Sequence, residues 1–209
     1  MVLTDEVTED HDVESAEGDL FCDLMLAAWP AAQIAVSNGG SLRAGLPAGE
    51  LTYGALFRAM PFDNRFAIVD VTGAALRRLV TTNLQTATDI LSWSGLTAKA
   101  RCNGNTLDVE IMINGQKLDE GRTYELVTSD FLASGGQGVI GELKLSATAI
   151  HNTTVIVREA MAGVLRTWKG TSKATIDPTR ILSVTHRRLD YVGSRPIECA
   201  ETGSDASEP

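Results

Sequence analysis

The chain has 209 residues, with 27 Asp and Glu against 18 Lys and Arg, and a formal net charge of −9. This composition is typical of a water-soluble globular protein. No uncharged apolar run reaches the ~18 residues that cross a bilayer, so we expect no membrane partner. The acidic N-terminal decapeptide MVLTDEVTED differs from the basic and then apolar pattern of secretory signals, and predicts no export signal in this chain.

The negative charge is concentrated at the two ends. Residues 1–23 hold nine acids and no Lys or Arg, and residues 197–209 hold four acids and none either, so the body between them is mildly basic. Acidic polar ends are typical of solvated segments. We therefore predict an acidic segment 1–12, a domain 13–196 and a disordered acidic tail from 197. The mildly basic body suits a small anionic ligand, while the absence of Lys/Arg runs longer than two residues predicts no nucleic-acid partner.

In chain order, apolar spacing together with caps and breakers predicts helices at four places: 19–29, 53–59, 72–87 and 153–168. Thr52 is the expected cap of the second helix, and Thr72 is expected to start the third. Short apolar runs predict strands at 34–37, 66–71, 124–129 and 181–186.

Between residues 97 and 113 the pattern changes to alternation. Asn103-Gly104 and Asn114-Gly115 interrupt this pattern and are strong hairpin signals. We expect the strand at 124–129 to continue this β-meander. Because strands cluster in the middle of the chain, the sequence predicts one α+β domain with a mixed sheet, a β-meander and flanking helices.

Cysteine and histidine spacing offers little chemistry. The cysteines, Cys22, Cys102 and Cys199, are too few and too odd in number for a disulfide framework. No H-x-H, D-x-H, H-E-x-x-H or C-x-x-C spacing occurs, so we expect no metal centre in this chain. No G-x-S-x-G elbow is present either, although a catalytic triad assembled from distant segments stays open.

Three loops carry residues suited to a ligand. Asn38 and Arg43 flank a glycine turn and present an amide and a planar guanidinium, which suits a phosphate. Phe62 and Phe131 each lie beside a proline or glycine turn. Two such rings could sandwich a flat heteroaromatic ring, with a contribution on the order of 1–3 kcal/mol per stacked base. For each phenylalanine, the alternative that it belongs to the core stays open.

Seven short stretches between residues 14 and 141 occur in a characteristic order: Glu14-Ser-x-x-Gly18-Asp-Leu20, Asn38-Gly-Gly-x-x-Arg43, Leu51-Thr52-Tyr-Gly, Pro61-Phe62-x-Asn64, Val71-Thr-Gly73-x-x-Leu76, Ser94-Gly95-Leu96 and Asp130-Phe131-Leu-Ala-x-Gly-Gly136. In this order they resemble the C-terminal domain of the 5′-nucleotidase family of metallophosphatases, which includes UDP-sugar hydrolases and 2′,3′-cyclic nucleotidases. Each stretch alone is unspecific, and the order carries the resemblance.

In that family an N-terminal domain with two divalent metal ions hydrolyses the phosphate ester, and the C-terminal domain holds the nucleoside. The resemblance implies that Phe62 and Phe131 stack on the base, and that Asn38 and Arg43 contact the nucleotide, with Arg43 nearest the phosphate. It implies no catalytic residue, metal ligand or cofactor in this chain, and a metallophosphatase domain or chain as its partner. Family members usually work in the periplasm or outside the cell.

Two positions depart from the family pattern. Val13 stands where an arginine often precedes the Glu-Ser pair, and Gln137 replaces the acid that accepts hydrogen bonds from ribose hydroxyls. A glutamine can still bond a hydroxyl without contributing charge, so the resemblance keeps Gln137 among the expected substrate-binding residues. Losing one charge-assisted hydrogen bond costs about 1.5–3 kcal/mol. Two interpretations stay open. One is a substrate-binding domain of a two-domain phosphohydrolase of nucleotide catabolism, which alone binds and does not hydrolyse. The other is a stand-alone, non-catalytic binding or interaction module derived from that domain.

Overall fold

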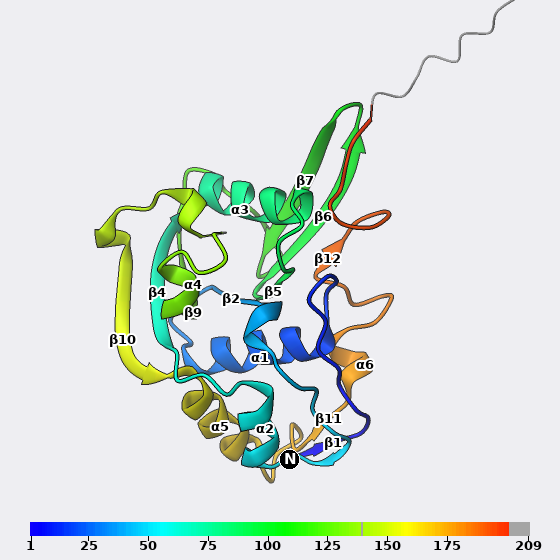
Figure 1. The fold of residues 1–209 in the computed structure, drawn as a ribbon, viewed down its shortest axis with the longest axis vertical. Coiled ribbons are helices and arrows are strands. Elements are labelled where there is room, and N and C mark those ends of the chain that lie inside the picture. The colour runs from blue at the N-terminus through cyan, green and yellow to red at the C-terminus, as the bar shows by residue number, and fades with distance from the viewer. Residues whose placement is uncertain (139, 201–209) are drawn as a thin grey trace, which may run out of the picture.

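A five-stranded mixed sheet forms the centre of the computed structural model, which describes residues 1–138 and 140–200 (Figure 1). Its strand order is β10-β4-β9-β2-β5. Within this sheet β9 and β2 run parallel, and the other neighbours are antiparallel. The expected mixed sheet is therefore confirmed. Its strands are β2 (Ile34–Asn38), β4 (Arg65–Thr72), β5 (Leu91–Ser94), β9 (Thr123–Ser129) and β10 (Ile150–Ile156).

Helices cover both faces of the sheet, so its central strands are apolar on both sides. Along β4 the side chains alternate: Phe66 belongs to one core cluster and Ala67 to the other. The cluster that contains Ala67 also contains the apolar face of α3 (Gly73–Gln85), which lies across the sheet from the remaining long helices (Figure 1). The cluster that contains Phe66 includes side chains of α1 (Ala16–Ala28), α2 (Tyr53–Ala59) and α5 (Val157–Trp168).

The first three long helices begin at side-chain caps. Ser15, Thr52 and Thr72 each accept a hydrogen bond from the backbone N–H three residues later, at 3.1, 3.2 and 3.2 Å. Each cap satisfies one of the unpaired donors of a first helical turn. The expected helices consequently begin and end within three residues of α1, α2 and α3. Among the described residues, no helix is long and apolar enough to cross a membrane.

Two smaller mixed sheets flank the central one. The first has the order β12-β6-β7-β8, with β6 (Leu96–Asn103), β7 (Thr106–Ile113), β8 (Gln116–Lys117) and β12 (Leu189–Asp190). The second has the order β11-β1-β3, with β1 (Val2–Leu3), β3 (Gly49–Glu50) and β11 (Thr175–Ile176).

Both expected hairpins are present. Asn114 and Gly115 form the two-residue loop between β7 and β8, with φ values of 48° and 78°. Between β6 and β7 the loop is Gly104-Asn105, one residue later than the Asn-Gly pair suggests, and Gly104 has a φ of 60°. Positive φ at these positions gives hairpin loops whose twist matches that of the strands.

Three predicted elements are wrong in type or place. The strand at 124–129 does not continue the meander, because β9 pairs with β4 and β2 in the central sheet. The helix predicted at 153–168 begins later, at Val157, because residues 153–156 belong to β10, which pairs with β4. Residues 181–186 form no strand: a short helix, α6 (Pro178–Ile181), ends there, and Val184 is 87% exposed, so the apolar run has no core to cover.

Both ends of the described chain pack onto the domain. Leu3 and Val7, within the predicted acidic segment, are 1% and 2% exposed and belong to a core cluster. Ile197, the first residue of the predicted tail, is 7% exposed and its N–H donates to the carbonyl of Leu84 at 2.9 Å. Residues 201–209 of that tail lie outside the described residues.

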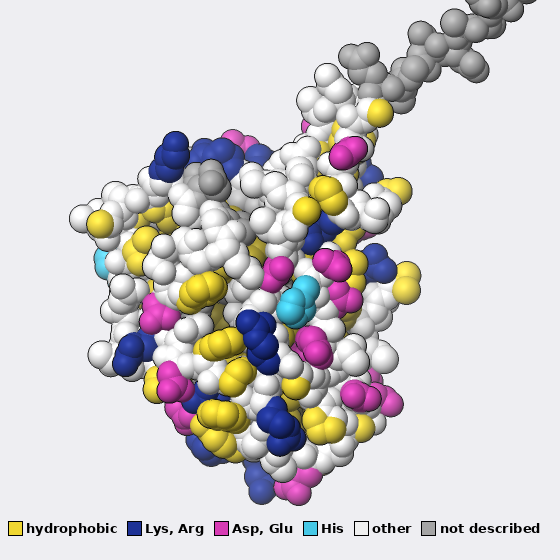
Figure 2. All heavy atoms as spheres, in the orientation of Figure 1, with side chains coloured by type: hydrophobic (Ala, Val, Ile, Leu, Met, Phe, Trp, Pro, Cys, Tyr) yellow, Lys and Arg dark blue, Asp and Glu magenta, His cyan; other side chains and the backbone are white. Residues whose placement is uncertain are grey.

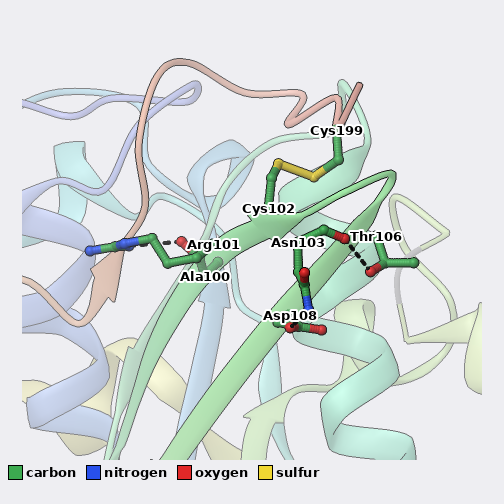
Figure 3. Close-up of a disulfide and its surroundings, with 7 residues drawn as sticks. All are labelled: Ala100, Arg101, Cys102, Asn103, Thr106, Asp108 and Cys199. Atoms are coloured by element: carbon green, nitrogen blue, oxygen red, sulfur yellow. Dashed lines mark hydrogen bonds between the residues drawn. A yellow bond between two sulfur atoms is a disulfide. The ribbon is translucent and has the colours of Figure 1, made fainter. Parts of the chain in front are cut away.

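A disulfide joins Cys102 and Cys199, 97 residues apart in sequence (Figure 3). The bond links the end of β6 to the C-terminal segment, with 5.4 Å between the Cα atoms. Cys22 is buried and free. The count of three cysteines argues against a framework of several disulfides, but it does not reveal which two thiols the fold brings together.

Candidate ligand-binding site

Strand register brings four loops to one end of the central sheet. Phe66, near the start of β4, pairs with Ser129 at the end of β9, and β2 runs parallel to β9. Leu91 at the start of β5 pairs with Asn38 at the end of β2. The loops before β4 and β5 therefore meet the loops after β2 and β9. The end of β2 and three of these loops carry the five residues that we predict for the site: Asn38, Arg43, Phe62, Phe131 and Gln137.

Four side chains from three segments form a hydrogen-bonded chain. Asn38 is 2% exposed, and its Nδ2 donates to Gln137 Oε1 at 2.8 Å. Gln137 Nε2 donates in turn to Asp89 Oδ2 at 2.6 Å. On the other side, Ser41 Oγ donates to Asn38 Oδ1 at 2.5 Å. The structure thus joins Asn38 to Gln137 and adds Asp89, a carboxylate that the sequence did not place here.

The glycines around this chain are needed for close approach. A Cβ at Gly40 would lie 2.4 Å from Gln137 Nε2 and 2.6 Å from Asp89 Oδ2, so a larger residue would push these groups apart. Gln137 has a φ of 58°, between Gly135 and Gly138 with φ of 95° and 77°. This left-handed backbone, which glycine adopts readily, turns the loop so that the amide of Gln137 reaches Asn38.

Arg43 and Phe62 lie together. The guanidinium carbon of Arg43 is 5.0 Å from the centroid of the Phe62 ring, within the range of a cation–π interaction. Arg43 Nη1 also donates to the carbonyl of Leu42 at 2.9 Å. The Phe62 ring remains 37% exposed. An exposed aromatic face and a positive charge therefore occur side by side.

Phe131 lies on the short helix α4 (Asp130–Ala133) and is 46% exposed. A Cβ at Gly136 would lie 2.5 Å from Phe131 Cε1, so the following loop passes directly over the edge of this ring. In the described part of the chain, neither Phe131 nor Phe62 pairs with another aromatic ring. Both side chains are too exposed to serve mainly as core residues.

The space-filling view shows how these groups share a surface. In Figure 2 hydrophobic side chains and Lys or Arg side chains lie next to one another over the region between α4 and α2, and acidic side chains gather over the neighbouring N-terminal segment. Exposed aromatic surface next to a guanidinium suits a ligand with a flat ring and an anionic group.

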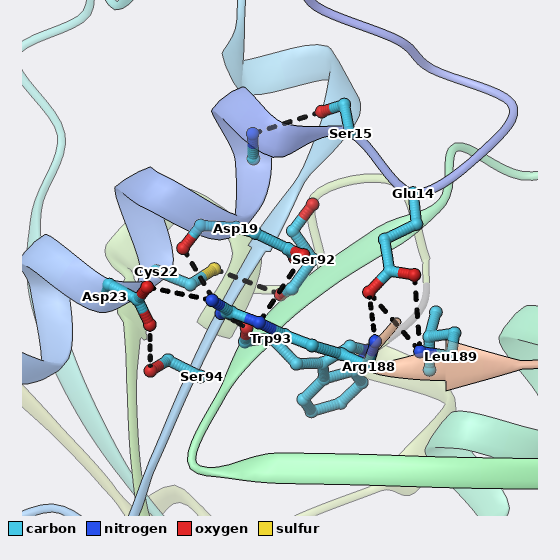
Figure 4. Close-up of polar contacts among 11 residues, drawn as sticks. Glu14, Ser15, Asp19, Cys22, Asp23, Ser92, Trp93, Ser94, Arg188 and Leu189 are labelled. Carbon is cyan, nitrogen blue, oxygen red and sulfur yellow. Dashed lines mark hydrogen bonds and ion pairs between the residues drawn. The ribbon is translucent and has the colours of Figure 1, made fainter. Parts of the chain in front are cut away.

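The stretch that begins at Glu14 contributes to the interior instead. Glu14 Oε1 accepts a hydrogen bond from the backbone N–H of Arg188 at 2.7 Å (Figure 4). The guanidinium of Arg188 pairs with Asp23 at 2.8 Å, and its Nε lies 3.4 Å from Asp19 Oδ2. Burial raises the pKa of Asp19 to about 9 and also raises the pKa of Glu14. This cluster fastens α1 to β12, and Val13 just before it is 46% exposed and adds no charge.

Sequence reasoning missed Asp89 because it overlooked β5, the strand that follows. The apolar run at 90–94, ILSWS, is the signal that could have revealed this strand. A polar residue directly before a buried strand lies at the edge of the sheet, where loops meet. Nothing in the local sequence pairs Asp89 with Gln137, which lies 48 residues away.

Comparisons with known proteins agree with this fold. The sequence model described as "5'-nucleotidase, C-terminal domain" matches residues 3–142. The chain is 30% identical over 139 residues to the trifunctional nucleotide phosphoesterase protein YfkN of Bacillus subtilis, covering 60% of this chain and 10% of that protein. It is 27% identical over 107 residues to protein UshA of Escherichia coli, covering 51% and 20%.

A solved structure shows the same likeness. The 5′-nucleotidase precursor of Thermus thermophilus superimposes with a TM-score of 0.69 at 26% identity, covering 84% of this chain and 38% of that one. The chain therefore spans less than half the length of each of these three proteins. The family match covers well over half of the chain, and the chain belongs to the family of 5′-nucleotidase C-terminal domains.

Proposed function

We propose that this chain is the nucleotide- or nucleoside-ester-binding domain of a metal-dependent 5′-nucleotidase-type phosphohydrolase. The carrying observation is that two half-exposed phenylalanine rings lie at the same end of the sheet as the buried amide of Asn38. Hydrolysis in this proposal belongs to a metallophosphatase domain or chain outside these residues, which would supply the two metal ions.

The proposed ligand uses each group differently. Its base stacks on Phe62 and Phe131, and its phosphate lies near the guanidinium of Arg43. Gln137 offers its amide to the sugar, and the buried Asn38 holds Gln137 in place from behind. Gln137 carries no charge itself, but its Nε2 is bound to the carboxylate of Asp89, so an acceptor lies directly behind the amide.

Calorimetric titration of the metal-free chain with adenosine, AMP and UDP-glucose tests this proposal. We expect Phe62→Ala to weaken binding about tenfold or more, since one stacked base contributes on the order of 1–3 kcal/mol. Val184→Ala is the control, because Val184 is an 87% exposed hydrophobic residue outside the four loops of the site. An equal loss in both variants, or no binding by the wild type at millimolar concentration, contradicts the proposal.

A second candidate function is a non-catalytic binding or interaction module that keeps the fold without nucleotide recognition. The exposed Val13 and the uncharged Gln137 favour it, because both remove charge from the family's pattern. Absence of nucleoside binding, together with unchanged folding of the chain, supports this alternative. Phosphatase activity that appears only when a metallophosphatase partner is added counts against it.

A further inference from the structure

Arg195 binds the C-terminal end of a helix that is more than 100 residues away in sequence. Its Nε donates to the carbonyl of Asn83 at 3.0 Å, and its Nη2 donates to the carbonyls of Thr86 and Thr88 at 3.2 and 3.0 Å. Helix α3 has no basic residue in its own last turn. Arg195 therefore supplies the donors and the positive charge that the unpaired carbonyls of a helix C-terminus favour.

The same guanidinium also holds the N-terminal segment. Arg195 Nη1 donates to the carbonyl of Asp12 at 3.0 Å. The carbonyl of the adjacent His11 accepts from the N–H of Ile90 at 2.8 Å, and a Cβ at Gly39 would lie 2.9 Å from His11 Cα. Segment 10–13 therefore packs against the turn that follows Asn38, and hydrogen bonds from Arg195 connect this segment to the loop 86–89.

This loop carries the carboxylate of the candidate site. The side chain of Asn83, 1% exposed, donates from Nδ2 to the carbonyl of Asp89 at 2.9 Å, while Arg195 holds the carbonyls of Asn83 and Thr88. Asp89 then accepts from Gln137. We infer that Arg195 is a positioning residue for the proposed ligand site, because it holds the loop that brings Asp89 to Gln137.

The position of Arg195 is itself fixed on its C-terminal side. Two residues later, the N–H of Ile197 donates to the carbonyl of Leu84, and four residues later Cys199 is bonded to Cys102. The C-terminal segment therefore lies on α3 and is tied to the β6–β7 hairpin (Figure 3). The contacts at Ile197 and Cys199 keep the segment that carries Arg195 beside α3.

Side-chain amide NMR signals test this inference without any ligand. In Arg195→Gln we expect the NH₂ signals of Gln137 and Asn38 to shift and to exchange with solvent about tenfold faster, because Asp89 leaves its hydrogen bond. The control is Arg101→Gln. Arg101 is also half-buried and also binds backbone carbonyls, but these are the carbonyls of Ala100 on β6 and Asp190 on β12 and not those of the loop 86–89.

Ligand affinity gives the second measurement. Where the wild type binds adenosine, we expect Arg195→Gln to bind it about tenfold more weakly and Arg101→Gln to stay within about twofold. If the wild type binds no nucleoside, the proposed function is overturned, and the NMR signals alone then test the positioning role of Arg195. Equal effects of the two variants overturn the inference, as do unchanged Gln137 and Asn38 signals in Arg195→Gln.

Should Arg195→Gln fail to fold, Arg195→Lys decides the question. A lysine keeps the charge but lacks the planar fork that reaches three carbonyls at once. A folded Arg195→Lys chain with shifted Gln137 signals supports the positioning role. A folded chain with wild-type signals at Gln137 and Asn38 overturns it.

Discussion

Glu17 lies on α1 with its side chain 0% exposed, and within the described part of the chain neither of its carboxylate oxygens has a hydrogen-bond partner. Burial raises the pKa of Glu17 from its ordinary 4.5 to about 8, and the nearby charge of Glu9 adds to this effect. At neutral pH the folded protein therefore holds a proton on Glu17 that the unfolded chain releases. Burying an ionised carboxylate at this position would cost far more free energy than burying the protonated carboxyl group.

The stability contribution of protonated Glu17 is complete below pH 4.5 and is lost as the pH rises through about 8, because the folded state binds this proton more tightly than the unfolded state. We expect the free energy of unfolding in urea to fall less between about pH 6 and pH 9 in Glu17→Gln than in the wild type. Glu110→Gln, at an exposed position, is the control and should follow the wild type. Parallel pH curves for all three proteins would show that Glu17 is not the responsible group.

Among the elements, α5 supports a loop that has no regular structure of its own. Arg158, 4% exposed, donates from Nη1 to the carbonyls of Met60 and Phe62 at 3.1 and 2.9 Å. Its Nη2 donates to Asp63 Oδ1 at 2.6 Å. The segment between α2 and β4, which presents the Phe62 ring, is therefore held by a helix that follows it by almost 100 residues.

Removing this guanidinium leaves two carbonyls and a carboxylate without their donor. We expect Arg158→Met to lower the free energy of unfolding by about 2–4 kcal/mol, measured by chemical denaturation. Arg166→Met, exposed on the same helix, should stay within about 0.5 kcal/mol of the wild type. If Arg158→Met also stays within about 0.5 kcal/mol of the wild type, the loop is held by contacts other than those of Arg158.

For the whole molecule, the Cys102–Cys199 bond closes a loop of 97 residues. In the chain-entropy description, closing a loop of this length restricts the unfolded chain and contributes about 4–5 kcal/mol. The bond therefore stabilises both the fold and the candidate site, because the bonded segment also carries Arg195.

Reduction of this bond should lower the thermal midpoint of the wild type, measured with and without a thiol reductant. The double variant Cys102→Ser, Cys199→Ser is the control, and its midpoint should not respond to the reductant. A shift in the double variant would assign the effect to the reductant itself. An unchanged wild type, with the bond shown to be reduced, would mean that side-chain packing alone holds the C-terminal segment.

Local features of this protein were readable from the sequence. Thr52 and Thr72 each begin a predicted helix and cap it through a backbone N–H only three residues away. The turns at Gly104 and Asn114 depend on two adjacent residues. The sequence by itself determined these elements, and the ordered stretches identified the family, because the interactions involved connect neighbouring residues or recur as short patterns.

The tertiary structure alone decided the remainder. It placed β9 between β4 and β2, bonded Cys102 to Cys199, and brought Asp89 to Gln137 across 48 residues. It also brought Arg195 to Asn83 across 112 residues. Each of these contacts forms only when the sheet and its two covering layers are assembled, since strand order and core packing, not local spacing, determine which distant loops meet.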